Sequence, residues 1–321
     1  MTIDASNMLK VIEEFAQQCK IALGLPKGMS VSGKVDNIVI AGMGGSAIGG
    51  DILRSMSSKI PVFVVRDYNL PDFVSENTLV FAVSYSGNTE ETISAFEDAQ
   101  RKKAKIIAVT SGGLISTMAK KVIKVPQGIM PRAALGYLFF PMLGVLVNSR
   151  LIAVSDDEIK EMLDVLSDVE YFKAKGQEIA QKINSRTPLI YSSELLKPVA
   201  YRWKTQLNEN SKVASFCHSF SELCHNEIVG YQTAKRDRFV SIFIRDLQDN
   251  ERIKKRMNIT KDIILTKVDV EEVFTKGGSL LARMFFAIYL GDFASYYLAL
   301  SNKIDPTAVS VIENLKKRLK E

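Results

Sequence analysis

VFAVSYSGNTEE, residues 80–91, joins a short apolar run to an acidic pair through a turn rich in hydroxyl groups. The apolar run has the composition of a buried strand, and the acidic pair favours the first turn of a helix. Ser84, Ser86 and Thr89 therefore lie around Gly87 where a strand gives way to a helix, and the free N–H groups of a helix N-terminus bind anions. Because no lysine follows the glycine, the turn suits a phosphate monoester better than a metal-bound triphosphate. The alternative is that these hydroxyls only cap the helix.

A glycine-rich turn, GMGGSAIGGD at residues 42–51, follows the preceding strand candidate. The spacing Gly42-x-Gly44-x-x-Ala47 fits the dinucleotide-binding fingerprint, with Asp67 as a candidate ligand of a ribose hydroxyl. The same spacing occurs wherever a strand turns tightly into a helix, so an NAD-dependent dehydrogenase and a purely structural turn both remain alternatives. Since ligands bind at the carboxyl ends of parallel strands, one pocket could use both turns.

Strand-like and helix-like segments alternate through most of the chain, which predicts an α/β protein with two doubly wound parallel sheets. We expect strands at residues 37–41, 61–65, 79–83, 105–109, 122–125, 189–191, 213–216, 239–244 and 263–266. We expect helices at residues 7–23, 133–151, 195–210, 278–301 and 306–320. The expected domains are residues 1–154 with an N-terminal helix, a helical connector at 155–184, and residues 185–321 with C-terminal helices.

The composition is that of a globular protein, with 46% hydrophobic and 24% charged residues in 321. We find neither an apolar run that could cross a membrane nor a signal-peptide core, and three cysteines fit a reducing compartment, so we expect a cytoplasmic protein. The net charge of +6 favours anionic ligands. Because the basic residues are dispersed, we expect neither nucleic acid nor a membrane as a partner.

Gly44-Gly45-Ser46, followed by Ser-Tyr-Ser-Gly-Asn-Thr at residues 84–89, resembles the sugar isomerase (SIS) fold, whose members bind phosphosugars. The whole chain resembles the bifunctional phosphoglucose/phosphomannose isomerases. The resemblance implies two SIS domains and an aldose–ketose isomerase that interconverts glucose 6-phosphate, and by extension mannose 6-phosphate, with fructose 6-phosphate through an enediol. It implies a homodimer that needs no cofactor, with a phosphosugar as its small-molecule substrate and a place in glycolysis and gluconeogenesis.

This isomerisation needs a base that moves a proton between C1 and C2, groups that open the sugar ring, and a positive charge beside the developing oxyanion. By resemblance, Glu209 is the proton-transfer base, His225 and Lys303 assist ring opening, and Arg132 stabilises the enediolate. The resemblance also implies the residues that hold the substrate: Gly45, Ser46, Ser84, Ser86 and Thr89.

Each of the four catalytic candidates has an ordinary structural alternative. Glu209 could be a solvated acid near a helix end, His225 a hydrogen-bonded core group, Lys303 a partner of a helix dipole, and Arg132 a member of a surface ion pair. A non-catalytic phosphosugar-binding regulatory module is therefore the second alternative function. We expect no metal, because the spacing of two Cys-His pairs does not match that of zinc ligands: Cys217-His218 and Cys224-His225.

Overall fold

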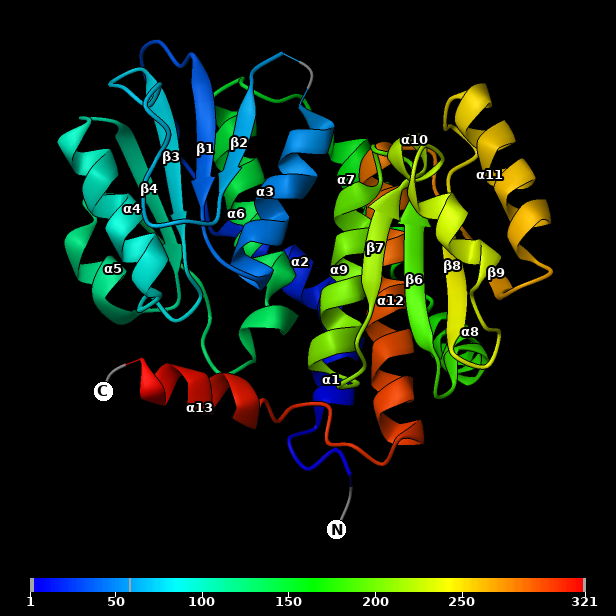
Figure 1. Ribbon diagram of the computed structural model, residues 1–321. Coiled ribbons are helices and arrows are strands. Elements are labelled where there is room, and N and C mark those ends of the chain that lie inside the picture. Colours follow the sequence, from blue (N-terminus) through cyan, green and yellow to red (C-terminus); the bar gives the residue numbers. More distant parts are fainter. Residues whose placement is uncertain (1–2, 58, 320–321) are drawn as a thin grey trace. The chain divides into compact units, whose positions relative to one another are not determined.

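A computed structural model describes residues 3–57 and 59–319, which form two compact units. The first, called here the β1–β5 unit, comprises Glu14–Ser167 and Ser279–Ala282. The second, called the β6–β9 unit, comprises Met1–Glu13, Asp168–Gly278 and Arg283–Glu321. Each unit contains a parallel sheet (Figure 1). The sequence-based boundaries after residues 154 and 184 stay predictions, and the chain ends at Met1 and Glu321 lie outside the described residues.

The sheet of the β1–β5 unit has five parallel strands in the order β2-β1-β3-β4-β5. The strands are β1 (Asn37–Ala41), β2 (Val62–Val65), β3 (Thr78–Val83), β4 (Lys105–Thr110) and β5 (Val122–Lys124). The helices are α2 (Phe15–Gly24), α3 (Gly45–Met56), α4 (Glu90–Arg101), α5 (Gly113–Met118), η1 (Pro131–Ala133), α6 (Leu135–Asn148) and α7 (Asp156–Val165).

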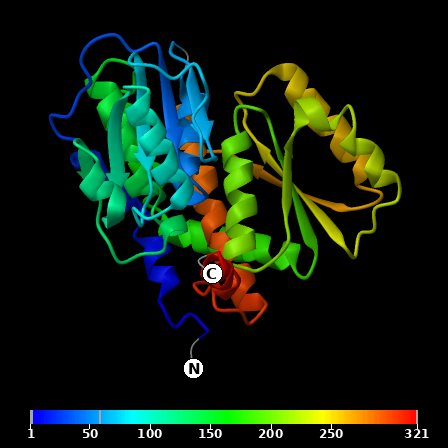
Figure 2. The ribbon, with the colours of Figure 1, turned by 60° about the vertical axis from the view of Figure 1, so that its left-hand side comes forward.

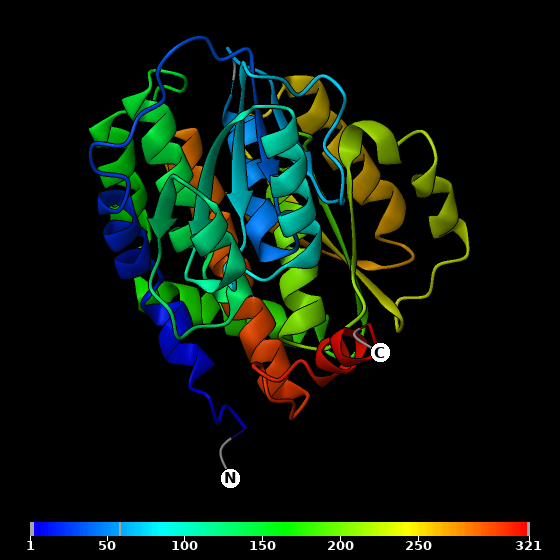
Figure 3. The same ribbon diagram turned by 90° about the vertical axis from the view of Figure 1, so that its left-hand side faces the viewer.

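Helices cover both faces of this sheet, which explains why its central strands are almost wholly apolar. Val39 and Ala41 of β1 pack in one cluster with Ala95 and Ala99 of α4. The alternate residue Ile40 faces α3, where a Cβ on Gly50 would lie 2.9 Å from its side chain. Figure 3 brings α4 and α5 to the front of the sheet. The carboxyl ends of β1 and β3 are neighbours, because the two strands pair directly.

The sheet of the β6–β9 unit has four parallel strands in the order β7-β6-β8-β9. The strands are β6 (Thr187–Ser192), β7 (Phe216–Ser219), β8 (Phe239–Arg245) and β9 (Asp269–Phe274). The remaining elements are α1 (Met8–Glu13), α8 (Val169–Ile183), α9 (Lys197–Glu209), α10 (Phe220–Leu223), η2 (Glu227–Gln232), α11 (Glu251–Ile264), α12 (Leu280–Ser301) and α13 (Ser310–Arg318). Figure 2 shows α9 and α11 on opposite sides of this sheet.

Two strand predictions in this unit are wrong. Residues 263–266 do not form a strand, because α11 continues to Ile264 and buries that side chain. The strand lies later, at β9, where ion pairs stabilise its acidic residues: Glu272 binds Arg245 and Lys261. The strand predicted at 213–216 begins only at Phe216, since the backbone of Val213 is bonded to the end of α9.

The single helix predicted at residues 7–23 is two helices, α1 and α2, separated at Glu14. Tertiary contacts explain the break. The Tyr289 hydroxyl donates to Glu13 O at the end of α1, at 3.1 Å. Gln18 of α2 instead donates to Ala133 O at 2.9 Å and accepts from Gly136 N at 2.7 Å. Each helix is thus bonded within its own unit.

Among the described helices, α12 alone is long and apolar enough to cross a membrane by length and composition, so the expectation that the chain has no such apolar run is wrong. Its apolar window is 83% buried inside the structure. A core helix that is hydrophobic on all sides has the same composition, so burial within the protein explains its hydrophobicity.

Candidate active site

The serine turn at the end of β3 is held together by its own hydroxyl groups. Ser84 is buried, and its Oγ lies 2.8 Å from Thr89 Oγ1 and accepts from Gly87 N at 3.0 Å. Gly87 has φ +71°, and a Cβ there would lie 2.8 Å from Thr110 Oγ1, so glycine is required. Ser86 is exposed and accepts from Asn88 N at 3.2 Å. The turn therefore has one fixed shape with hydroxyls at the carboxyl edge of the sheet.

Two helices begin at this edge without a side-chain cap in the described structure. Thr89 is the N-cap residue of α4 but makes no capping hydrogen bond, and Gly44, which precedes α3, has no side chain to make one. The alternative in which the hydroxyls merely cap α4 thus lacks the bond it requires. Uncapped N–H groups at the N-termini of two helices that follow neighbouring strands can bind an anion.

Arg132 lies against the glycine turn. A Cβ on Gly45 would lie 3.1 Å from both Arg132 Cα and Pro131 O, so only glycine lets η1 approach α3 this closely. Arg132 is 3% exposed, which removes the alternative of a solvated surface ion pair. Ser46, in the first turn of α3, is also buried. The β1–β5 unit therefore brings Gly45, Ser46, Ser84, Thr89 and Arg132 to one edge of its sheet.

Residues that the sequence interpretation missed fix this edge. Tyr85 Oη donates to Pro126 O at 3.0 Å and accepts from Ile129 N at 3.3 Å, which joins the serine turn to the segment before Arg132. Ser111 Oγ donates to Tyr85 O at 2.6 Å, and Asn88 Oδ1 accepts from Leu114 N at 2.9 Å. Tyr85 and Asn88 lie within the motif at residues 84–89, whereas no motif marks their partners, which only the fold brings to them.

Glu209 is the last residue of α9 and lines a cavity of about 360 Å³ in the β6–β9 unit. The cavity walls are Asn208, Lys212–Ala214 and the segment Ala308–Ile312 at the start of α13. Nothing in the sequence links this C-terminal segment to Glu209, which lies about a hundred positions earlier. The half-buried Glu209 thus borders a space large enough for a small ligand.

His225 and Lys303 also belong to the β6–β9 unit, but neither is among the described residues that line the cavity beside Glu209. His225 is exposed, so the alternative of a core histidine fails. The segment that follows it is fixed to the sheet, because Tyr191 Oη donates to Glu227 Oε1 at 2.5 Å. Lys303 is exposed just after α12. The chain is held two residues later, because Lys212 Nζ donates to Asp305 O at 2.6 Å.

The equivalent edge of the second sheet carries a buried ion pair. Strands β6 and β8 occupy the places of β1 and β3 in the strand order, but acidic residues follow β8. The buried Asp246 accepts from Arg283 Nε at 2.8 Å and from Gln248 N at 2.9 Å. Burial raises the pKa of the neighbouring Asp249. A guanidinium from α12 thus pairs with the acid that follows β8, while the buried Ser192 and Ser193 follow the end of β6 at the same edge.

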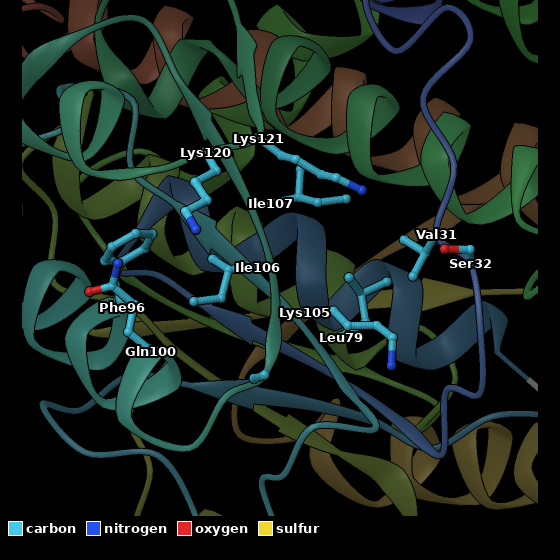
Figure 4. Close-up of a pocket in the computed structure, with 11 residues that line it drawn as sticks. Val31, Ser32, Leu79, Phe96, Gln100, Lys105, Ile106, Ile107, Lys120 and Lys121 are labelled. Carbon is cyan, nitrogen blue, oxygen red and sulfur yellow. The ribbon is translucent and has the colours of Figure 1, made fainter.

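A larger cavity, of about 500 Å³, lies at the opposite, amino edge of the first sheet (Figure 4). Its rim carries Lys105, Lys120 and Lys121 beside the apolar Ile106 and Ile107. Lys105 Nζ donates to two backbone carbonyls, at 2.9 and 2.8 Å. Helices α4 and α5 end near this edge, and lysines favour the carbonyl ends of helices. These contacts give Lys105 a structural role at the rim.

Family models match both halves of the chain. A model of the SIS domain matches residues 34–130, and one described as the bacterial phospho-glucose isomerase C-terminal SIS domain matches residues 172–319. Among solved structures, the C-terminal domain of glucosamine-fructose-6-phosphate aminotransferase from Francisella tularensis is similar in fold to this chain, with a TM-score of 0.75. That comparison covers 96% of this chain and 100% of that one at 15% identity, which supports the fold alone. The expected pair of SIS domains is confirmed.

Full-length relatives are also similar to this chain. The bifunctional phosphoglucose/phosphomannose isomerase of Caldicellulosiruptor bescii is 45% identical over 98% of this chain and 99% of that protein. That of Thermoplasma acidophilum is 44% identical over 90% and 91%. These matches do not favour a dehydrogenase or a regulatory module. The chain belongs to the family of bifunctional phosphoglucose/phosphomannose isomerases.

Proposed function

We propose that this protein is an aldose–ketose isomerase that interconverts glucose 6-phosphate and mannose 6-phosphate with fructose 6-phosphate. Family membership supports the reaction, and one structural observation carries the site. The N-termini of α3 and α4 lie uncapped at adjacent strand ends, beside the hydrogen-bonded pair of Ser84 and Thr89. In this proposal the sugar phosphate accepts hydrogen bonds from these N–H groups and from hydroxyls, with Ser86 at the exposed end of the turn.

The proposed chemistry divides among four side chains. His225 and Lys303 assist ring opening by moving the proton between the ring oxygen and the anomeric hydroxyl. The Glu209 carboxylate then removes the proton from C2 of the aldose and returns it to C1. The hydroxyl proton moves from O2 to O1, so no atom is gained or lost. Arg132 stabilises the negative charge of the enediolate between these steps.

Family membership also motivates the finer parts of the proposal. The protein acts in glycolysis and gluconeogenesis in the cytoplasm, as a homodimer that needs no cofactor. The residues described here are consistent with a reaction driven by proton transfer alone, because they supply a carboxylate, an imidazole, an ammonium group and a guanidinium.

The test is NMR of fructose 6-phosphate with pure enzyme in heavy water, without added metal. We expect deuterium at C2 of both glucose 6-phosphate and mannose 6-phosphate, because a solvent-exchanging carboxylate carries the proton. Deuterium in glucose 6-phosphate alone would refute the second substrate. Binding of fructose 6-phosphate without any conversion would instead indicate a regulatory module.

A further inference from the structure

One face of α9 is polar although it is buried. Arg202, Gln206 and Asn210 recur at intervals of four residues, so they lie in line along the helix and its C-terminal cap. Their exposed fractions are only 1, 3 and 1%. Polar side chains rarely occupy such a position unless specific partners satisfy them.

The partners of this face are two buried residues of α12, Asp292 and Ser295. Arg202 Nη2 and Gln206 Nε2 donate to the two oxygens of Asp292, at 2.7 and 3.0 Å. Asn210 Nδ2 donates to Ser295 Oγ at 2.9 Å, and that hydroxyl donates to Asp292 O at 2.8 Å. We call these five residues the α9–α12 polar ladder.

The ladder ends beside Glu209. Asn210 is the next residue in the chain, and Asn208, on the other side, donates to Val213 O at 2.8 Å and to Ser215 Oγ at 3.1 Å. Hydrogen bonds of both neighbours therefore hold the end of α9 on either side of Glu209, and Glu209 itself borders the cavity. A general base must reach its proton within hydrogen-bonding distance, and a small misplacement reduces the rate strongly.

Stability alone does not account for the ladder. Apolar residues of similar volume usually replace a buried ion pair without loss of stability, and often with a gain. An apolar contact between two helices tolerates sliding and rotation, however, whereas each hydrogen-bonded pair permits one register. The ladder thus sets where the end of α9 lies along α12.

We propose that the α9–α12 polar ladder consists of positioning residues that hold Glu209 in register for proton transfer. The inference rests on the proposed role of Glu209 as the base. Replacing the ladder with apolar residues should therefore preserve the fold and impair the reaction.

The main test is the variant Arg202→Met/Gln206→Leu/Asp292→Leu, with Ser295→Ala as a milder change that keeps the ion pair. We expect an unchanged or higher urea midpoint and a kcat lower by about tenfold to a hundredfold for the triple variant. We expect KM for fructose 6-phosphate to stay within about twofold, because the phosphate site is intact. For Ser295→Ala we expect a smaller fall in kcat, again with KM unchanged.

The matched control is Asp246→Leu/Arg283→Met, which replaces a buried ion pair of the same chemistry in the first turn of α12. We expect this variant to keep its kcat at a similar urea midpoint. An equal fall of kcat in the control and the ladder variants would mean that any loss of a buried pair disturbs the enzyme, and would overturn the proposal. If the triple variant does not fold, Ser295→Ala decides by the same comparison.

A double-mutant cycle identifies the residue through which the ladder acts. In a Glu209→Asp background, which already displaces the carboxylate, the ladder variants should cause no further loss, because both changes act on one group. Independent, multiplicative losses would overturn the proposal. Near-normal turnover by Glu209→Gln would refute the base assignment itself, and this measurement is made without touching the ladder.

Discussion

Lys303 adopts a left-handed backbone, with φ +56°, directly after α12. The helix ends in a Schellman motif, since Ile304 N donates to Ala299 O and Lys303 N donates to Leu300 O. Glycine is the usual residue at this position, and any other residue strains the backbone. Lys103 and Arg150 occupy the same position after α4 and α6, so the strain alone does not identify a functional residue.

Substitution by glycine separates the strain from the chemistry. We expect Lys303→Gly to raise the free energy of unfolding by about 0.5–1 kcal/mol, because it relieves the left-handed conformation. We also expect kcat to fall by about a hundredfold if the ammonium group assists ring opening. Urea unfolding and steady-state kinetics measure both effects. Lys103→Gly is the control and should gain stability without losing activity; a Lys303→Gly enzyme of normal kcat would contradict the assignment.

Glu209 allows the sharpest test of a single group. Glu209→Gln keeps the shape of the side chain and removes the base, so we expect kcat to fall by about 10²–10⁴-fold. The fold should be intact, because an amide fits the same cavity. The incorporation of deuterium at C2 should fall in parallel, since both measurements report the same proton transfer. The exposed Glu97→Gln is the control, and near-normal turnover by the Glu209 variant would exclude this residue as the base.

At the scale of elements, α13 is an outlier, because none of its residues is buried. Val311 and Leu315 are exposed, and the start of the helix nevertheless lines the cavity beside Glu209. The helix therefore contributes little to the core but forms part of the wall of the proposed site.

A chain that ends at Val309 tests this role. We expect the free energy of unfolding to change by less than about 1 kcal/mol, because residues 310–319, the described part of the removed segment, are exposed. We expect kcat to fall and KM to rise, because an opened cavity admits water beside the base. Urea unfolding and steady-state kinetics with fructose 6-phosphate measure the two effects. Unchanged kinetic constants would show that the wall is dispensable.

Elements stabilised by their own composition could be predicted from the sequence, and those stabilised by distant partners could not. The apolar run before Ser84 contains its own strand signal, so β3 was predicted within one residue. Strand β9 was missed because only Val273 and Thr275 near its end are buried, and its acidic residues depend on Arg245, Lys261 and Lys182. Local periodicity cannot report such pairs.

The same distinction applies to the candidate site. The serine turn was recognisable because its hydroxyls and Gly87 are adjacent in the chain. The approach of Arg132 to Gly45 joins residues 87 positions apart, and resemblance rather than any local pattern suggested that arginine. The sequence analysis assigned no role to Arg202, Gln206 and Asn210, because their partners on α12 are about 85–90 positions away in the chain.

For the whole molecule, the two sheets share one strand order but differ at their carboxyl edges. We expect isothermal titration with inorganic phosphate to give one equivalent per chain, bound by the β1–β5 unit. Ser84→Ala/Thr89→Val should abolish this binding, because it removes both hydroxyls of the pair. Ser116→Ala, outside the turn, is the control. Two equivalents, or binding that survives the double substitution, would contradict a single phosphate site.

The Asp246–Arg283 pair has a consequence for how the protein responds to its ligand. In the β6–β9 unit, Arg283 balances the charge of Asp246. In the β1–β5 unit, the N-termini of α3 and α4 have no side-chain cap and are proposed to bind the anionic phosphate of the substrate. Bound substrate should consequently stabilise the two units unevenly. We expect backbone amide hydrogen exchange to slow in the glycine and serine turns when substrate is added, and to stay constant around Asp246. If the phosphate site is as proposed, two sheets of similar strand order thus differ chemically at their carboxyl edges, because only the β1–β5 unit obtains a counter-charge from the substrate.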